Sequence, residues 1–155
     1  MIATVIAVLG TLLGAVVAGA FQQRNASRTQ RAAADEQLRR ERLEAVTALA
    51  AAGFDHWRAM WMRGEAQLAG ATPEKLDELR SASHITRSAI TRPLVAVQVL
   101  IPDEAVRTTA RDMVIGAFSM RGHAHSAETL ATAREAARDA HDQFVDAAAA
   151  YLTAA

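Results

Sequence analysis

The sequence predicts an all-α protein, in which an N-terminal transmembrane helix continues into an antiparallel bundle of about four helices. Three observations predict this class: residues 1–21 carry no charged side chain, apolar residues then repeat at helical spacing, and breaks containing Gly or Pro separate the repeating segments. The 155 residues are enough for one domain. We expect a transmembrane helix at 1–21, an Arg-rich juxtamembrane helical stalk at 22–42 and the helical bundle at 43–155.

The first segment meets the length that a membrane crossing requires, which is about 20 apolar residues. Arg24, Arg28 and Arg31 follow it before the first acidic residue, so the positive-inside rule places the rest of the chain in the cytoplasm. Two alternatives stay open. Ala18, Gly19 and Ala20 resemble a signal-peptide cleavage site, although no basic region precedes the apolar run, and the run also suits a core helix of a soluble protein.

Small residues recur every fourth position within this segment, at Gly10, Gly14 and Ala18. Such a stripe lets two helices approach closely in lipid, which predicts a homo-oligomer or packing against another membrane helix. The alternative is that an Ala-rich composition places small residues on every face.

The stalk contains neither Pro nor Gly, so nothing should interrupt the helix between the membrane and the bundle. Arg24, Arg28 and Arg31 can contact lipid head groups or phosphates, or simply form the solvated end of the anchor. The acidic and basic residues balance at 17 each, and we expect no direct sequence-specific nucleic-acid binding.

The first two bundle helices are predicted from apolar spacing. The first presents Leu43, Val46, Ala50, Phe54, Trp57, Trp61 and Leu68, and it ends at residues 70–73, where Thr72 suits the cap and Pro73 the first position of the next helix. The second presents Leu76, Leu79, Ala82, Thr86, Ala89, Pro93, Val97 and Leu100. Pro93 should kink or break it near Thr91. Residues 94–101 also have the composition of a strand, but a lone strand would have no partner.

The third and fourth helices follow a break at residues 101–103. The third presents Val106, Ala110, Met113, Ala117 and Met120, and the fourth presents Leu130, Ala133, Ala137, Ala140, Phe144, Ala147 and Tyr151. Residues 121–126 form the loop between them, with Ser126 as the expected cap.

No constellation predicts catalysis, a cofactor or a metal. The chain has no Cys, and the Glu-x-x-His and His-Glu-x-x-His signatures are missing. His123 and His125 could share a metal, but two further ligands would be needed. His56 and His84 are predicted as polar edges of helices or as buried, hydrogen-bonded groups.

Trp57, Met60 and Trp61 are the predicted contacts for a protein partner, although core packing is the simpler role for them. Trp57 and Trp61 are four residues apart, so they stack on one face of a helix. Met60 and Met62 cannot both share that face, and one of them should be exposed and able to adapt to a partner.

Several motifs together carry a family resemblance: Gly-Thr-Leu-Leu-Gly at 10–14, Arg-Ala-Met-Trp at 58–61, the run at 83–94 and Ala-Arg-Glu-Ala-Ala at 133–137. With them, nearly the whole chain resembles small actinobacterial proteins of Streptomyces that are labelled KilB-like, after a membrane-associated protein of conjugative plasmids. The resemblance implies a role in plasmid transfer or in its spread along the mycelium, with no catalytic residues.

We therefore predict a non-enzymatic, membrane-anchored interaction protein whose bundle docks a partner. The resemblance would make that partner a plasmid-transfer component such as a DNA translocase. Two alternatives remain: a self-assembling, pore-like membrane oligomer, and a tethered sensor that binds a ligand in a cavity among Trp57, Trp61, Met113 and Phe118.

Overall fold

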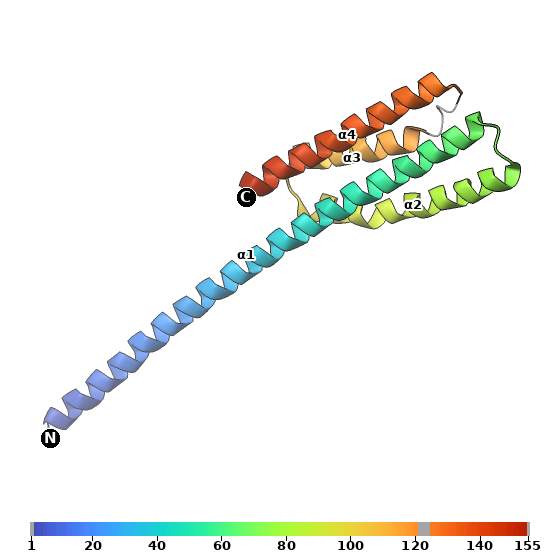
Figure 1. Cartoon of the computed structure of the whole chain (residues 1–155). Coiled ribbons are helices and arrows are strands. Elements are labelled where there is room, and N and C mark those ends of the chain that lie inside the picture. The colour runs from blue at the N-terminus through green and yellow to red at the C-terminus, as the bar shows by residue number, and fades with distance from the viewer. Residues whose placement is uncertain (1, 121–124, 155) are drawn as a thin grey trace. The chain divides into compact units, whose positions relative to one another are not determined.

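A computed structural model describes the backbone of residues 2–120 and 125–154 and the side chains from residue 27 onward, with the same gap. Four helices make up the fold: α1 (Ile2–Leu68), α2 (Pro73–Leu100), α3 (Glu104–Ser119) and α4 (Ala127–Ala154) (Figure 1). The all-α, four-helix architecture is thus confirmed. The chain divides into two compact units, residues 1–39 and residues 40–155, and the second unit holds the bundle.

The helix α1 continues without a break from the first unit into the second, as the lack of Pro and Gly in the stalk predicts. Among the side chains that the structure describes, no helix combines the length and the apolar character that a membrane crossing needs. The predicted transmembrane helix at 1–21 lies outside those side chains.

The predicted helix caps at Thr72 and Ser126 are confirmed. α1 ends at Leu68, and the turn that follows contains Gly70, whose φ of +69° is a backbone conformation that favours glycine. The Thr72 hydroxyl accepts a hydrogen bond from the Lys75 backbone N–H, at 3.4 Å, and Pro73 opens α2. The Ser126 hydroxyl accepts one from the Thr129 N–H at 3.1 Å, and α4 begins directly after it.

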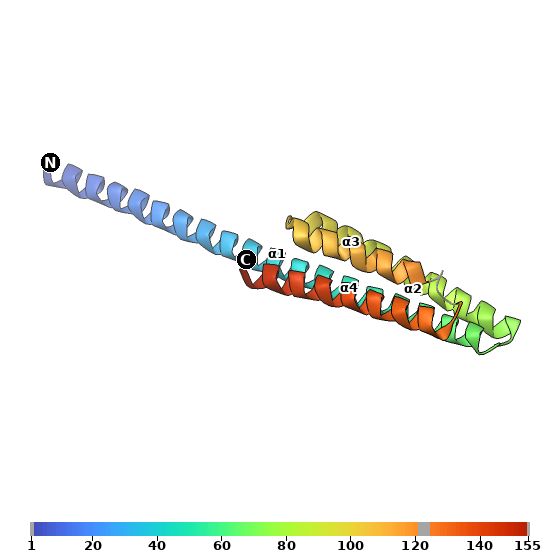
Figure 2. The same ribbon diagram turned by 90° about the horizontal axis from the view of Figure 1, so that it is seen from above.

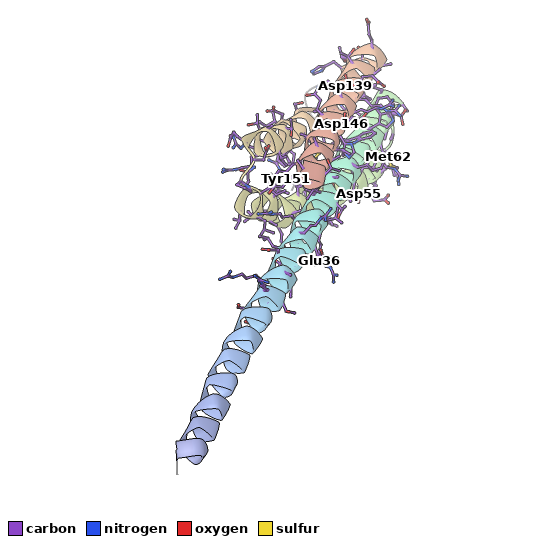
Figure 3. All side chains as sticks on the ribbon, turned by 90° about the vertical axis from the view of Figure 1, so that its left-hand side faces the viewer. Glu36, Asp55, Met62, Asp139, Asp146 and Tyr151 are labelled. Carbon is purple, nitrogen blue, oxygen red and sulfur yellow. The ribbon has the colours of Figure 1, made fainter. Side chains whose placement is uncertain are left out.

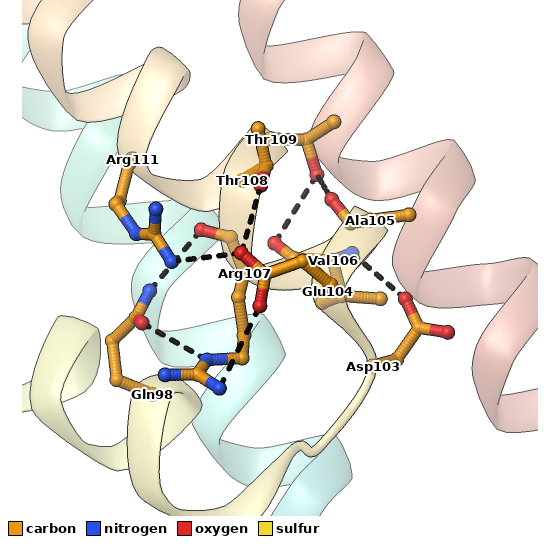
Figure 4. A network of polar contacts seen from close by, with 9 residues as sticks. All are labelled: Gln98, Asp103, Glu104, Ala105, Val106, Arg107, Thr108, Thr109 and Arg111. Atoms are coloured by element: carbon orange, nitrogen blue, oxygen red, sulfur yellow. Dashed lines mark hydrogen bonds and ion pairs between the residues drawn. The ribbon is translucent and has the colours of Figure 1, made fainter.

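A polar network fixes the turn between α2 and α3 (Figure 4). The Asp103 carboxylate accepts a hydrogen bond from the Val106 N–H at 3.0 Å and so caps α3. Gln98 on α2 and Arg107 on α3 exchange two hydrogen bonds, of 3.1 and 3.2 Å. Glu104 lies 3.7 Å from Arg107 and 3.2 Å from Arg111. Residues of both helices are therefore tied together at this end of the bundle.

The buried residues form two clusters. We define the first core as Ala45, Val46, Leu49, Ile90, Val97, Ile101, Val106, Ala110, Met113, Val114, Phe144 and Ala148. We define the second core as Trp57, Met60, Ala117, Met120, Leu130, Ala133 and Ala137. All four helices supply the first core, whereas the second core takes residues from α1, α3, α4 and the start of the loop after α3.

The helices are arranged so that α3 packs against both α2 and α4. Figures 1 and 2 show α2 and α4 on opposite sides of the bundle. Their outer surfaces consequently face away from each other.

The predicted faces of α3 and α4 are largely confirmed. The four predicted residues on α3 are buried, as are Met120 directly after it and Leu130, Ala133, Ala137 and Phe144 on α4. The predicted face of α1 is wrong in part: Leu43, Phe54 and Leu68 are 51%, 42% and 41% exposed. The buried face of α1 also includes two glycines, Gly53 and Gly64, beside larger residues such as Leu49. A Cβ added at Gly53 would lie 2.9 Å from Met113, and one added at Gly64 would lie 2.8 Å from Leu130. Close helix approach, more than side-chain size, sets this face.

Of the predicted kink or break near Thr91, the break does not occur. α2 continues through Pro93 to Leu100, and residues 94–100 are helical, with no strand there. Pro93 removes one backbone N–H from the ladder. The residues beyond it, Val97 and Ile101, are fully buried in the first core, and this packing stabilises the helical turn that follows the proline. The predicted face of α2 missed Ile90 and Ser83, which are buried, and included Ala82 and Ala89, which are exposed.

Candidate docking groove between α1 and α4

Trp57 and Trp61 lie one turn apart on α1, and one arginine of α4 covers both. The Arg134 guanidinium is 4.7 Å from the centre of the Trp61 ring and 6.0 Å from that of Trp57. Phe54 extends the aromatic row, with its ring centroid 5.0 Å from that of Trp57 and the ring planes at 77°. Attraction between a guanidinium and the indole faces holds Arg134 in place at the surface.

Phe54, Trp57 and Arg134 line a groove with a volume of about 300 Å³. Its walls are Phe54, Trp57, Arg134, Arg138, His141 and Asp142. Trp57 is 9% exposed, and its Nε1–H is buried with no hydrogen-bond partner among the described residues. A buried donor without an acceptor costs about 1–3 kcal/mol, so this indole N–H lowers the stability of the bundle beside the groove.

A short polar chain closes the α4 side of the groove. Asp142 lies 3.8 Å from the Arg138 Nε and 3.2 Å from the His141 Nδ1. The His141 ring in turn meets Phe54, with centroids 6.4 Å apart. The groove thus combines an aromatic wall from α1 with cationic and acidic groups from α4.

The structure separates the two methionines beside the tryptophans. Met60 is 7% exposed and belongs to the second core, whereas Met62 is 48% exposed (Figure 3). The prediction that only one of them faces solvent is confirmed. Of the predicted partner contacts, Trp57 and Met60 are buried and Trp61 is partly buried, so Trp61 and Met62 are the side chains within reach of a partner.

The other predicted contact residues belong to the first unit of the chain. The side chains of Gly10, Gly14, Ala18 and Arg24 lie outside the described residues. Those of Arg28 and Arg31 are described and are exposed on α1.

His56 is a buried, hydrogen-bonded group, as one of its two predicted roles required. It is 3% exposed, and its Nδ1 lies 3.0 Å from the Thr86 hydroxyl. The pKa of His56 is lowered from 6.5 to about 4, mainly by burial and also by the nearby Arg87 charge, while a hydrogen bond to the Ser83 backbone acts in the opposite direction. Arg87 is itself held 4.4 Å from the centre of the Phe118 ring. The imidazole is therefore neutral at physiological pH.

The four residues of the predicted ligand cavity do not share one site. Trp57 lines the groove between α1 and α4, Phe118 lines a separate one with His56 and Arg87, and Met113 is buried in the first core. Across residues 27–120 and 125–154 no cluster of His, Asp or Glu could hold a metal ion. His123 lies outside the described residues.

Sequence reasoning missed the α4 half of the groove. Arg134, Arg138 and His141 are spaced by four and three residues, which places them on one face of a helix. That spacing was a usable signal, but only the structure shows that this face meets the tryptophans of α1.

Comparison with known proteins gave two matches. Residues 43–152 match a family model described as KilB plasmid transfer protein. The chain is 45% identical to Protein KilB of Streptomyces lividans over 149 residues. The aligned region covers 96% of this chain and 97% of that protein. No solved structure matches the chain.

Proposed function

Because this chain belongs to the KilB plasmid transfer protein family, we propose that it acts in plasmid transfer as a non-enzymatic, membrane-anchored protein whose helical bundle docks a protein partner. The observation that carries the docking role is the groove between α1 and α4, whose wall residue Arg134 also covers the neighbouring Trp61. The partner that we propose is another component of plasmid transfer, such as a DNA translocase.

The residue types in the groove support docking. Trp and Arg are enriched among the few residues that supply most of the binding energy of protein interfaces. Here an arginine is already held by cation–π contacts, so little conformational freedom would be lost when a partner binds. Met62 adds an exposed, adaptable side chain on the same helix.

The membrane anchor that we propose is residues 1–21, with the bundle in the cytoplasm. The support is the uncharged apolar run and the three arginines, Arg24, Arg28 and Arg31, that follow it. The chain has no cysteine, so single cysteines introduced at Ser27 and Ser126 report topology directly. Both should resist a membrane-impermeant thiol reagent in whole cells and react after lysis. Labelling of both from outside would overturn the cytoplasmic placement.

The docking role is tested by Trp61→Ala and Arg134→Ala in a mating assay in which the variant is the only copy of the protein. We expect each to lower transfer frequency by about tenfold, the effect of losing one strong interface contact. Ile115→Ala is the matched control, because Ile115 is 63% exposed on α3 and takes no part in the groove.

A photo-crosslinking residue at Met62 identifies what the groove binds. We expect the full-length protein to crosslink in cells to a plasmid-transfer component. Trp61→Ala should abolish that product, whereas the control Ile115→Ala should leave it unchanged. Wild-type transfer by both groove variants, with no crosslinked product that depends on Trp61, would exclude the groove as the docking site.

A further inference from the structure

Charge is separated between two helices of the bundle, although the whole chain is neutral. α2 carries Lys75, Arg80, Arg87 and Arg92 against the acidic residues Glu74, Asp77 and Glu78. All three acidic residues lie in its first two turns, so from Leu79 to Pro102 the chain has three arginines and no acidic residue. α4 carries five acidic residues against two arginines. Because α2 and α4 lie on opposite sides of the bundle, the two charges cannot neutralise each other within one molecule (Figures 1 and 2).

The acidic residues of α4 form one stripe. We call Glu128, Glu135, Asp139, Asp142 and Asp146 the α4 stripe; their spacing of seven, four, three and four residues places them on a single helical face, and all are exposed. Figure 3 shows Asp139 and Asp146 following one another along this helix. Asp142 is paired with Arg138, but Glu135, Asp139 and Asp146 make no ion pair within the described part of the chain.

The outer surface of α2 combines positive charge with exposed apolar side chains. We define the α2 face as Ile85, Val95 and Val99, which are 73%, 55% and 75% exposed, together with the three arginines. Ile85, Arg92 and Val99 are seven residues apart, the repeat that helices use when they pack lengthwise on another helix. In this series two exposed apolar side chains, Ile85 and Val99, flank the charged Arg92.

The arginines of the α2 face differ in their existing contacts. Arg80 pairs with Asp77 at 3.1 Å on the surface, and Arg87 covers Phe118. Arg92 shares an open groove with Glu41 and Glu44 of α1 but forms no ion pair within the described residues. Arg92 is therefore the arginine at the centre of the face that is most available to a second molecule.

We propose that copies of this protein associate head to tail, with the α4 stripe of one copy packed on the α2 face of the next. The two surfaces have opposite charge, repeat every seven residues and lie on opposite sides of the bundle, so each copy can bind one neighbour through each. If two identical faces paired, five carboxylates would face five carboxylates, or three guanidiniums would face three guanidiniums, and like charges would repel. Such a heterologous contact extends into a chain or a ring.

The two kinds of side chain have different roles in this contact. Charge complementarity selects the partner face and its register, and burial of Ile85, Val95 and Val99 supplies the attraction that does not depend on salt. Exposed ion pairs are screened within about 8 Å at physiological ionic strength, so association should weaken as salt is raised.

Cysteine crosslinking of the full-length, naturally cysteine-free protein tests the geometry. Ser88 is exposed on the α2 side and Gln143 is exposed beside the α4 stripe, between Asp139 and Asp146. With a short bismaleimide, Ser88→Cys and Gln143→Cys should each remain uncrosslinked alone and should form a dimer when mixed. The variant that carries both cysteines should form a ladder of multimers. Dimers of either single-cysteine variant with itself, or no product from the mixture, would overturn the proposal.

Charge reversal tests the chemistry. Asp139→Arg/Asp146→Arg and Arg80→Glu/Arg92→Glu should each weaken self-association in mild detergent by about tenfold, measured by sedimentation, because several modest surface pairs become repulsive. Mixing the two variants should restore association, since a reversed stripe then meets a reversed face. Asp55→Arg/Glu65→Arg is the control for the first variant, with the same change of charge as Asp139→Arg/Asp146→Arg at exposed sites on α1.

These variants also separate the proposed contact from packing of the N-terminal segments. Self-association through Gly10, Gly14 and Ala18 would be indifferent to charge on α2 and α4 and would yield no crosslink between residues 88 and 143. Unchanged association of both reversed variants, or failure of the mixture to recover it, would therefore contradict the head-to-tail contact.

Discussion

The first core and the second core differ in what α2 supplies. In the first core α2 contributes Ile90 and Val97, which pack with aliphatic side chains and Phe144. Beside the second core the same helix contributes Ser83 and Thr86, which lie with the imidazole of His56. The second core is also where Trp57 has a donor without a partner. The first core is thus apolar throughout, whereas the second core has buried polar groups and an unpaired donor next to its grooves.

The largest expected effect is loss of packing in the first core. Phe144 is fully buried, so Phe144→Ala should lower the free energy of unfolding by about 3–5 kcal/mol through lost burial and an unfilled cavity. Chemical denaturation measures it. Val145→Ala, at an adjacent position that is 38% exposed, is the control and should change stability little. Similar losses for both variants would mean that the first core is not the stable part of the bundle.

A smaller, pH-dependent effect should come from His56, beside the second core. Its folded-state pKa of about 4 lies below the ordinary value of 6.5, so the unfolded chain binds the proton more readily. Stability from this group is complete above pH 6.5 and is lost as the pH falls from 6.5 towards 4, by about 1–2 kcal/mol at pH 5 after allowance for solvent screening near the groove.

Denaturation at pH 7.5 and pH 5 measures the effect of His56. His56→Gln should reduce the difference in stability between the two pH values, whereas His84→Gln, at an exposed position on α2, serves as the control for loss of one imidazole. An equal pH dependence in wild type and His56→Gln would show that another group is responsible.

The smallest expected effect comes from replacing a glycine at a close helix contact in each of the two cores. Gly53→Ala would place its Cβ 2.9 Å from the flexible end of Met113, whereas Gly64→Ala would meet both methyl groups of Leu130 at 2.8 Å. Ala gains about 1 kcal/mol over Gly in a helix, which should leave Gly53→Ala near neutral. Gly64→Ala should be less stable than Gly53→Ala by about 1 kcal/mol, because the branched leucine cannot turn both methyl groups away. Thermal melts of the two variants decide the order.

Sequence reasoning predicted the helices and caps better than it predicted their faces. Thr72, Pro73 and Ser126 act through local geometry, so their roles could be inferred from neighbours in the chain. The face of α1 could not, because Gly53 and Gly64 are defined by what they touch on α3 and α4. The effect of Pro93 was mispredicted for the same reason. The sequence shows the local cost of the missing N–H, but not the packing of Val97 that outweighs it.

The candidate groove was predictable only from its α1 side. Trp57 and Trp61 were apparent as a stacked pair, but their partner Arg134 lies more than 70 positions away in sequence and carries no motif of its own. The same limit applies to the α4 stripe. Its spacing can be read from the sequence, whereas its position opposite the α2 face follows from the order in which the helices pack.

The uneven contribution of α2 has a dynamic consequence. Ser83 is the only residue of its first half, up to Arg87, that is buried within the described structure, whereas Ile90 and Val97 anchor its second half. Opening the first half would expose little apolar surface, so its amide protons should exchange with solvent long before those of the second half. α2 is one continuous helix, but we expect the protection of its amides against exchange to increase from its first half to its second. Local unfolding should begin at the end next to the turn at Gly70.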